Sequence, residues 1–108
     1  MYRPPFGEVR HMHAATHLEM SISRTEFLRG LNRLANEAES FSEIGESEWE
    51  LCAASGCARV RFRELPPRRA GMLSLPRATV TLDLSGLPPD ARSAFLESFR
   101  RVFQRGGG

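Results

Sequence analysis

The sequence has no lysine, so all fifteen of its basic residues are arginine. This absence extends over the whole chain, and we therefore attribute it to coding bias and not to a binding site. No apolar run approaches the roughly 20 residues that a membrane-spanning helix needs. Residues 1–6 are polar and contain prolines, unlike a secretory signal. These absences predict a cytoplasmic protein without membrane contact.

The sequence also lacks the motifs of common catalytic and cofactor sites. It contains no G-x-S-x-G nucleophile motif, no phosphate-binding P-loop and no dinucleotide-binding glycine pattern. Its only aspartates are Asp83, on a predicted strand, and Asp90, at a predicted helix start, where both have ordinary structural roles. We therefore expect a protein that is not an enzyme and binds no cofactor.

The 108 residues suffice for one modest hydrophobic core. With 41% apolar and 26% charged residues, the composition is that of an ordinary globular domain. Residues 1–16 contain prolines and glycine without an apolar period, and residues 106–108 are all glycine. We predict a flexible N-terminal arm over 1–16, a single domain over 17–105 and a glycine tail over 106–108.

The closing residues Arg105-Gly106-Gly107-Gly108 resemble the glycine-ending tails of ubiquitin-like sulfur carriers. The resemblance covers four residues, and in that family the flexible end enters the active site of a partner. The alternative interpretation is a frayed helix end.

Residue spacing predicts a strand and then a helix in the first part of the chain. Apolar residues alternate with polar ones over 17–22, the period of a half-buried strand. Ser23 and Glu26 form a capping box, in which each side chain satisfies a free amide at a helix start. The helix is predicted to bury one face, formed by Phe27, Leu28, Leu31, Leu34, Ala35 and Ala38. Gly30 costs this helix about 1 kcal/mol relative to alanine, which indicates a close contact.

A hairpin is predicted in the middle of the chain. Apolar and polar residues alternate over 48–53 and again over 58–63, and Ser55-Gly56 is typical of a tight turn. Because Trp49 shares a face with the other apolar residues of its strand, we expect it to be buried.

A loop and a fourth strand are predicted next. Residues 66–71 read PPRRAG, which predicts a loop, and a strand follows over 73–84. In this strand Leu73 and Leu75 are expected to point inward. A bulge or bend across Pro76-Arg77 would then move the inward positions to even numbers, since proline cannot donate to the ladder.

Residues 86–90 begin the last helix, with prolines early and an acid in the first turn. Its apolar stripe consists of Ala91, Phe95, Phe99, Val102 and Phe103. The element order is therefore strand, helix, three strands and helix (β-α-β-β-β-α). This order predicts a two-layer α+β fold with a four-stranded, mainly antiparallel sheet and both helices on one face. The other face is then open to solvent or to a partner.

Arginines line this predicted open face and the loop beside it. Residues 59–77 contain six arginines against a single glutamate, whereas residues 37–50 contain six glutamates and no base. The arginines are Arg59, Arg61, Arg63, Arg68, Arg69 and Arg77. They form a candidate binding face for nucleic acid, although no aromatic residue is predicted there to stack on bases.

The acidic residues offer an alternative interpretation of these arginines. A two-residue turn in the hairpin pairs Glu50 with Arg61, and a four-residue loop pairs it with Arg59. Glu48 then faces the arginine two residues further along in either register. Each cross-strand pair of opposite charge contributes about 0.2–1 kcal/mol. We favour this solvated ladder of ion pairs over a nucleic-acid-binding face.

Cys52 and Cys57 lie on the two strands of the hairpin, with the spacing C-x4-C. A four-residue loop places them opposite each other, and a two-residue turn does not. In a cytoplasmic protein the default is two reduced thiols. A disulfide and a metal knuckle are the alternatives.

Three histidines form a further candidate metal site, with the spacing H-x-H-x3-H. In an extended segment His11, His13 and His17 all point the same way, and neutral imidazoles are common metal ligands. The spacing matches no structural zinc pattern, so we favour solvated histidines.

By elimination, the sequence predicts a small non-enzymatic binding or accessory protein that works through protein–protein contact. Its partner is another protein or a second copy of itself, in a homodimer. The first alternative is a nucleic-acid-binding protein that uses the six arginines. The second is a metal-binding protein that uses the N-terminal histidines.

Overall fold

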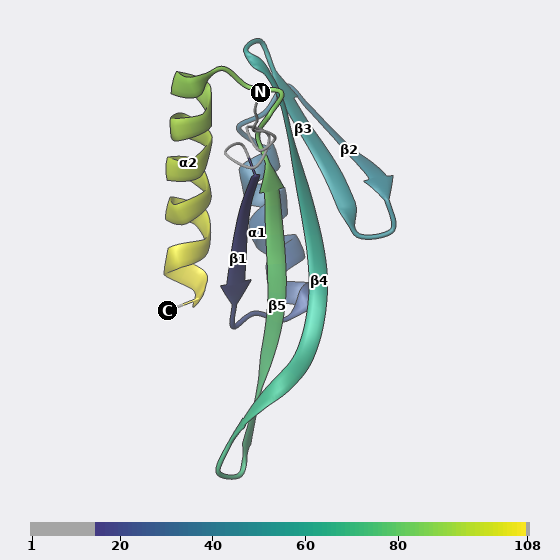
Figure 1. Cartoon of the computed structure of the whole chain (residues 1–108), viewed down its shortest axis with the longest axis vertical. Helices are drawn as coiled ribbons and strands as arrows, with labels where there is room; N and C mark the ends of the chain where they lie inside the picture. The colour runs from purple at the N-terminus through teal and green to yellow at the C-terminus, as the bar shows by residue number, and fades with distance from the viewer. Residues whose placement is uncertain (1–14, 108) are drawn as a thin grey trace, which may run out of the picture.

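The computed structural model describes residues 15–107, which form two helices and five strands (Figure 1). The strands are β1 (Ala15–Met20), β2 (Ser40–Gly45), β3 (Glu48–Ala53), β4 (Gly56–Ala70) and β5 (Leu73–Asp83). The helices are α1 (Arg24–Ala35) and α2 (Pro89–Gly107). The predicted α+β class is confirmed, but the sheet has five strands where four were predicted.

All strand pairs are antiparallel, and the strand order is β1-β5-β4-β3-β2. β2, the strand that was not predicted, lies at one edge and, among the described residues, pairs with β3 alone. Its two large apolar residues, Phe41 and Ile44, are three positions apart, so the alternation that identifies a strand is missing. The register shifts between Glu43 and Gly45, which leaves Ile44 as the extra residue of a bulge.

The capping box at the start of α1 is confirmed. The amide of Glu26 donates to Ser23 Oγ at 3.2 Å, and the amide of Ser23 donates to Glu26 Oε1 at 3.1 Å. The helix then buries Phe27, Leu31 and Leu34, as its apolar spacing predicts.

Phe27 lies at the centre of the hydrophobic core. Its ring centroid is 4.7 Å from that of Phe62 on β4 and 5.8 Å from that of Trp49 on β3. On the side of α2, the ring of Phe103 stacks against Phe27 at 5.4 Å. Trp49 is only 4% exposed, which confirms its predicted burial. Both helices and the sheet therefore contribute to one core.

The helices extend along the upper part of the sheet. Figure 1 shows α1 behind the strands and α2 along the side of β1. α2 buries Phe99, Val102 and Phe103 from its predicted apolar stripe, whereas Phe95 is half-buried.

The hairpin of β4 and β5 continues past the rest of the sheet (Figure 1). β4 runs to Ala70 and β5 starts at Leu73, so the predicted loop over 66–71 is wrong and the turn consists of Gly71 and Met72. Gly71 has a positive φ of 62°, which glycine adopts without strain. We call residues 65–77 the arm, because within the described part their backbones pair only with one another.

A bulge lies at the base of the arm, on β4. Leu65 pairs with Arg77 and Arg68 pairs with Leu75, so two residues of β4 face one residue of β5. The two residues are Pro66 and Pro67, which have no amide hydrogen to lose from the ladder. The bulge expected at Pro76 of β5 is therefore on the opposite strand.

Leu73 and Leu75 do not point into the core, in contrast to the prediction. Leu73 is 64% exposed and Leu75 is 37% exposed. The bulge is on β4, so the alternation of β5 continues through Pro76 and does not move these leucines to the core side. The arm also extends beyond the core, so neither α1 nor α2 covers it (Figure 1).

Candidate functional site

The face of the sheet that bears Arg59 and Arg61 carries the predicted ladder of ion pairs. Glu50 pairs with Arg59 at 3.3 Å between Oε2 and Nε, and Glu48 pairs with Arg61 at 3.4 Å between Oε2 and Nη2. This register is the one expected for a four-residue loop. Ala53 and Gly56 also pair, so the turn itself is Ala54-Ser55, one residue before the predicted position.

Arg77 is neutralised as well, at the base of the arm. Its Nη1 lies 2.7 Å from Glu19 Oε2 on β1, and its Nε donates to the carbonyl of Pro66 at 3.2 Å. Three of the six candidate arginines are thus engaged by acids. The other three, Arg63, Arg68 and Arg69, make no ion pair with the described side chains.

Asp83 completes the charge balance of this face. The amide and hydroxyl of Ser85 donate to Asp83 Oδ1 at 3.1 and 2.8 Å. Partial burial favours the neutral acid, but the Ser85 hydrogen bonds and the positive charges of Arg59 and Arg61 outweigh it and lower the pKa of Asp83. These groups, with Glu48, line a shallow depression of about 500 Å³ in which acids and bases are interspersed. The depression therefore offers no excess of positive charge to a phosphate.

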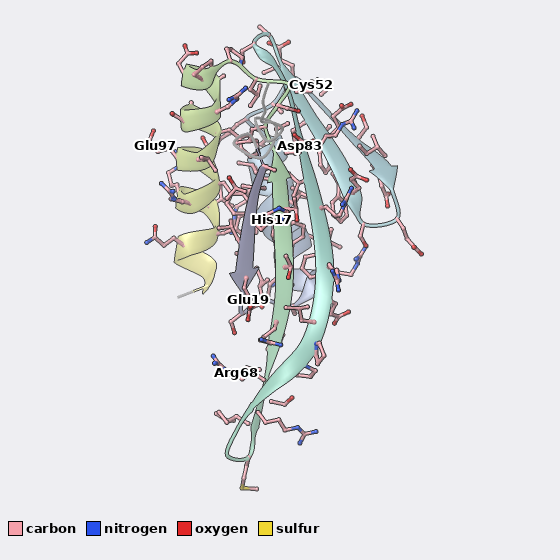
Figure 2. All side chains as sticks on the ribbon, in the orientation of Figure 1. His17, Glu19, Cys52, Arg68, Asp83 and Glu97 are labelled. Atoms are coloured by element: carbon pink, nitrogen blue, oxygen red, sulfur yellow. A yellow bond between two sulfur atoms is a disulfide. The ribbon has the colours of Figure 1, made fainter. Side chains whose placement is uncertain are left out.

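The arm presents arginines beside exposed apolar side chains. Arg68, labelled in Figure 2, is directly opposite Leu75, and Arg69 is opposite Ser74. Met72 at the turn is fully exposed and Leu73 follows it. Such a cluster of solvent-exposed apolar residues on a projecting element indicates a contact surface.

The β2 edge is the second exposed surface with apolar residues. Phe41 is 38% exposed and Ile44 is 43% exposed, and only the β3 side of the strand is paired within the described part of the chain. Glu39, Glu43 and Glu46 lie on this strand or beside it and are exposed. None of these three acids makes an ion pair with a described side chain. We call residues 39–46 the acidic edge.

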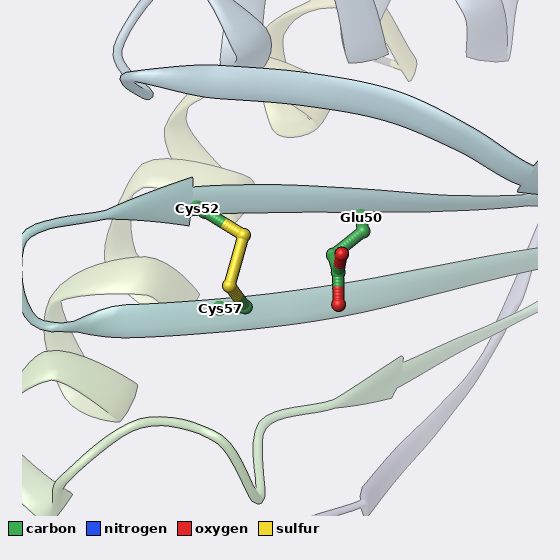
Figure 3. Close-up of side chains that lie close together, drawn as sticks. All are labelled: Glu50, Cys52 and Cys57. Atoms are coloured by element: carbon green, nitrogen blue, oxygen red, sulfur yellow. A yellow bond between two sulfur atoms is a disulfide. The ribbon is translucent and has the colours of Figure 1, made fainter.

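Cys52 and Cys57 are joined by a disulfide across β3 and β4 (Figure 3). The default prediction of two reduced thiols is therefore wrong, because the register places the two residues directly opposite each other, with 4.0 Å between their Cα atoms. Glu50 lies beside them, and the three ligand atoms fall within 4.8 Å of one another. Disulfide sulfurs are not thiolates, the form that binds metals, so this group is not a metal centre in its oxidised state.

The histidine site remains a prediction. His11 and His13 lie outside the described residues. His17 is exposed on β1, and its Nδ1 lies 3.1 Å from the hydroxyl of Thr81 on β5.

An apolar hollow of about 230 Å³ lies between the helices near the β3–β4 turn. Leu34 of α1, Phe95 and small side chains of α2 line it, with Leu51 and Ala58 from the sheet. It leaves Phe95 less completely packed than Phe99.

The chain matches no protein-family model and no curated protein sequence. Over residues 15–107, neither helix is long and apolar enough to cross a membrane. The candidate surfaces therefore rest on the geometry alone. The sequence also showed the acidic block over 37–50 and the arginines near the hairpin turn, but it predicted no strand before Glu48 and placed Arg68 and Arg69 in a loop.

Proposed function

We propose that this chain is a small non-enzymatic binding protein that works through protein–protein contact at the acidic edge. The observation that supports the proposal most directly is the exposed outer edge of β2. An exposed strand edge offers free backbone donors and acceptors, and an extended segment of a partner can add to it as a further strand. The regular segment available for this pairing is 40–43, before the bulge at Ile44.

The acids around β2 favour a basic partner segment. Glu39, Glu43 and Glu46 have no base among the described side chains, so an approaching arginine or lysine would meet free carboxylates. Phe41 and Ile44 would bury apolar side chains of the same segment. Phe41 and Glu43 are two positions apart and lie on the same face of β2, so we propose that the partner segment is extended and carries apolar and basic residues on one face, two positions apart.

The proposal includes the finer prediction that both helices cover the same face of the sheet. The stacking of Phe103 on Phe27, which itself contacts Trp49 and Phe62, supports it. With the helices on one side, the edge strand β2 is free for contact. Nucleic-acid binding, the alternative prediction, has less support because Arg59, Arg61 and Arg77 already contact carboxylates.

The test is a selection of random peptides on the purified protein, followed by NMR mapping of the bound peptide. We expect the enriched peptides to carry an apolar residue and an arginine or lysine two positions apart, so that both side chains lie on one face of an added strand. The amide shifts should be largest in β2 and β3. Glu43→Arg should weaken the selected peptide at least about tenfold, because like charges then face each other.

Glu97→Arg is the matched control, since Glu97 is an exposed acid on α2 (Figure 2) with no ion pair to a described side chain. It should leave peptide affinity unchanged. Peptides without basic residues, or shifts that map away from β2, would reject the proposal.

A further inference from the structure

We infer that the partner segment at the acidic edge is the arm of a second copy of this chain. This inference rests on the proposed function and identifies its partner. It accounts for the two exposed apolar surfaces of the described residues with one contact.

The charges of the two surfaces are complementary. The arm carries Arg68 and Arg69, with Arg63 just before it, and none of these makes an ion pair with a described side chain. The acidic edge carries Glu39 and Glu43, which likewise make no ion pair with a described side chain. Across an interface, opposite patches of this kind accelerate association and select the partner.

The apolar residues are complementary as well. Phe41 and Ile44 are exposed at the acidic edge, and Met72, Leu73 and Leu75 are exposed on the arm. On both surfaces they lie among the charged residues, as in an interface with an apolar centre and a polar rim. Contact between arm and edge would remove these side chains from water.

The prolines define which part of the arm can pair. Pro66 and Pro67 on β4 and Pro76 on β5 have no amide hydrogen, so the base of the arm is a poor partner for another strand. Residues 68–70 and 73–75, toward the tip, keep their amides. They include Arg68 and Arg69, which make no ion pair with a described side chain, and the exposed leucines Leu73 and Leu75.

Charge repulsion then favours a symmetric dimer in which each arm binds the acidic edge of the other copy. Contact between two β2 edges would oppose Glu43 to its own copy, and contact between two arms would oppose Arg68 and Arg69 to theirs. Placing the arm of each copy on the acidic edge of the other avoids both repulsions. The result is a twofold homodimer that contains the same contact twice.

The test uses two charge-reversed variants of the full chain, each followed by light scattering and sedimentation. The edge variant is Glu39→Arg with Glu43→Arg, and the arm variant is Arg68→Glu with Arg69→Glu. Wild type should dimerise more weakly as salt rises. Each variant alone should be monomeric, with its dimer Kd raised about 100-fold or more, because both of its contacts oppose like charges.

An equimolar mixture of the two variants should restore the dimer. In the mixed dimer the reversed edge faces the reversed arm, and the native edge faces the native arm, so both contacts are complementary. A double control with Glu97→Arg and Arg100→Glu on α2 should dimerise as wild type does. Trp49 fluorescence checks that every variant is folded.

Three results would overturn the inference. The first is a wild-type dimer Kd above roughly 100 µM; basic peptides that still bound β2 would then leave the proposed function intact. The second is a mixture that stays monomeric. The third is a monomeric wild type whose salt-dependent binding to duplex DNA is lost in the arm variant, which would make the arm a nucleic-acid site.

Discussion

Gly30 of α1 lies directly against the ring of Phe103 on α2. A Cβ added to Gly30 would overlap ring carbons of Phe103, and it would lie only 2.7 Å from Cζ. The missing side chain therefore allows the two helices to approach each other, which is the close contact that the glycine in the helix sequence indicated.

Gly30→Ala should destabilise the protein by up to about 2 kcal/mol. Alanine improves helix propensity by about 1 kcal/mol, whereas overpacking a core costs about 1–3 kcal/mol. The Phe103 ring cannot move aside easily, because it is held between Phe27 and Phe99. Urea unfolding measures the difference. In a Phe103→Leu background the same change should be neutral or stabilising. A stabilised Gly30→Ala in the wild-type background would show that the ring moves aside easily.

Phe99→Ala should cost about 3–5 kcal/mol of unfolding free energy, the usual range for a buried aromatic residue. Phe99 is 3% exposed and packs against Phe103 with 4.5 Å between ring centroids. Phe95→Ala should cost clearly less, since Phe95 is half-buried and lines the apolar hollow. Thermal melts compare the two variants, and equal losses would contradict the looser packing of Phe95.

The lowered pKa of Asp83 predicts a contribution to stability that depends on pH. A carboxyl whose pKa is lower in the folded state stabilises above its unfolded pKa, near 4, and loses this contribution as pH falls below it. The stability gap between wild type and Asp83→Asn should therefore shrink between pH 6 and about 2.5. Ser85→Ala, which removes one hydrogen bond to the carboxylate, should give an intermediate profile. A gap that stays constant with pH would refute the assignment.

Loss of the disulfide should destabilise the protein by about 2 kcal/mol. The bridge joins residues five apart, and closing so short a loop restricts the unfolded chain only modestly. Unfolding with and without reductant measures the effect. Cys52→Ala with Cys57→Ala should unfold at the same denaturant concentration in both conditions. Insensitivity of the wild type to reductant would count against the bridge.

The ion-pair ladder predicts that its acids suppress binding to nucleic acid. Glu48→Gln with Glu50→Gln frees Arg59 and Arg61, so affinity for duplex DNA should rise above that of wild type. The slope of log affinity against log salt concentration should be about −0.9 for each phosphate contacted. Fluorescence anisotropy at several salt concentrations tests this. Tight wild-type binding that Arg61→Ala abolishes would instead place nucleic acid first among the functions.

Much of the fold was predictable where local signals and burial agree. The capping box at Ser23 and Glu26, the alternation around Trp49 and the spacing of Phe27, Leu31 and Leu34 each reflect one buried face, and all three appear as predicted. The ladder register was predictable to within two alternatives, because alternating charges on two strands can match in only a few ways.

The missed features lie where no core imposes a pattern. β2 is held by its backbone pairing to β3, and its exposed residues Phe41 and Ile44 leave no alternation to detect. The β4 half of the arm was predicted as a loop because Pro66 and Pro67 usually interrupt strands, whereas here they occupy the bulge. Both features are parts of the candidate interface, so the surface proposed for function is the part of the fold that the sequence pattern describes least well.

The pairing of β1 with β5 bears on how the chain folds. Ala15 of β1 pairs with Asp83 of β5. The two strands can therefore pair only after most of the chain has been synthesised. Contacts between such distant segments are slow to form because a long loop has to close. During synthesis the β3–β4 hairpin can form early, whereas β1 stays without its neighbour until β5 has left the ribosome. A chain stalled before β5 would expose the apolar side of β1 and would be a natural substrate for chaperones.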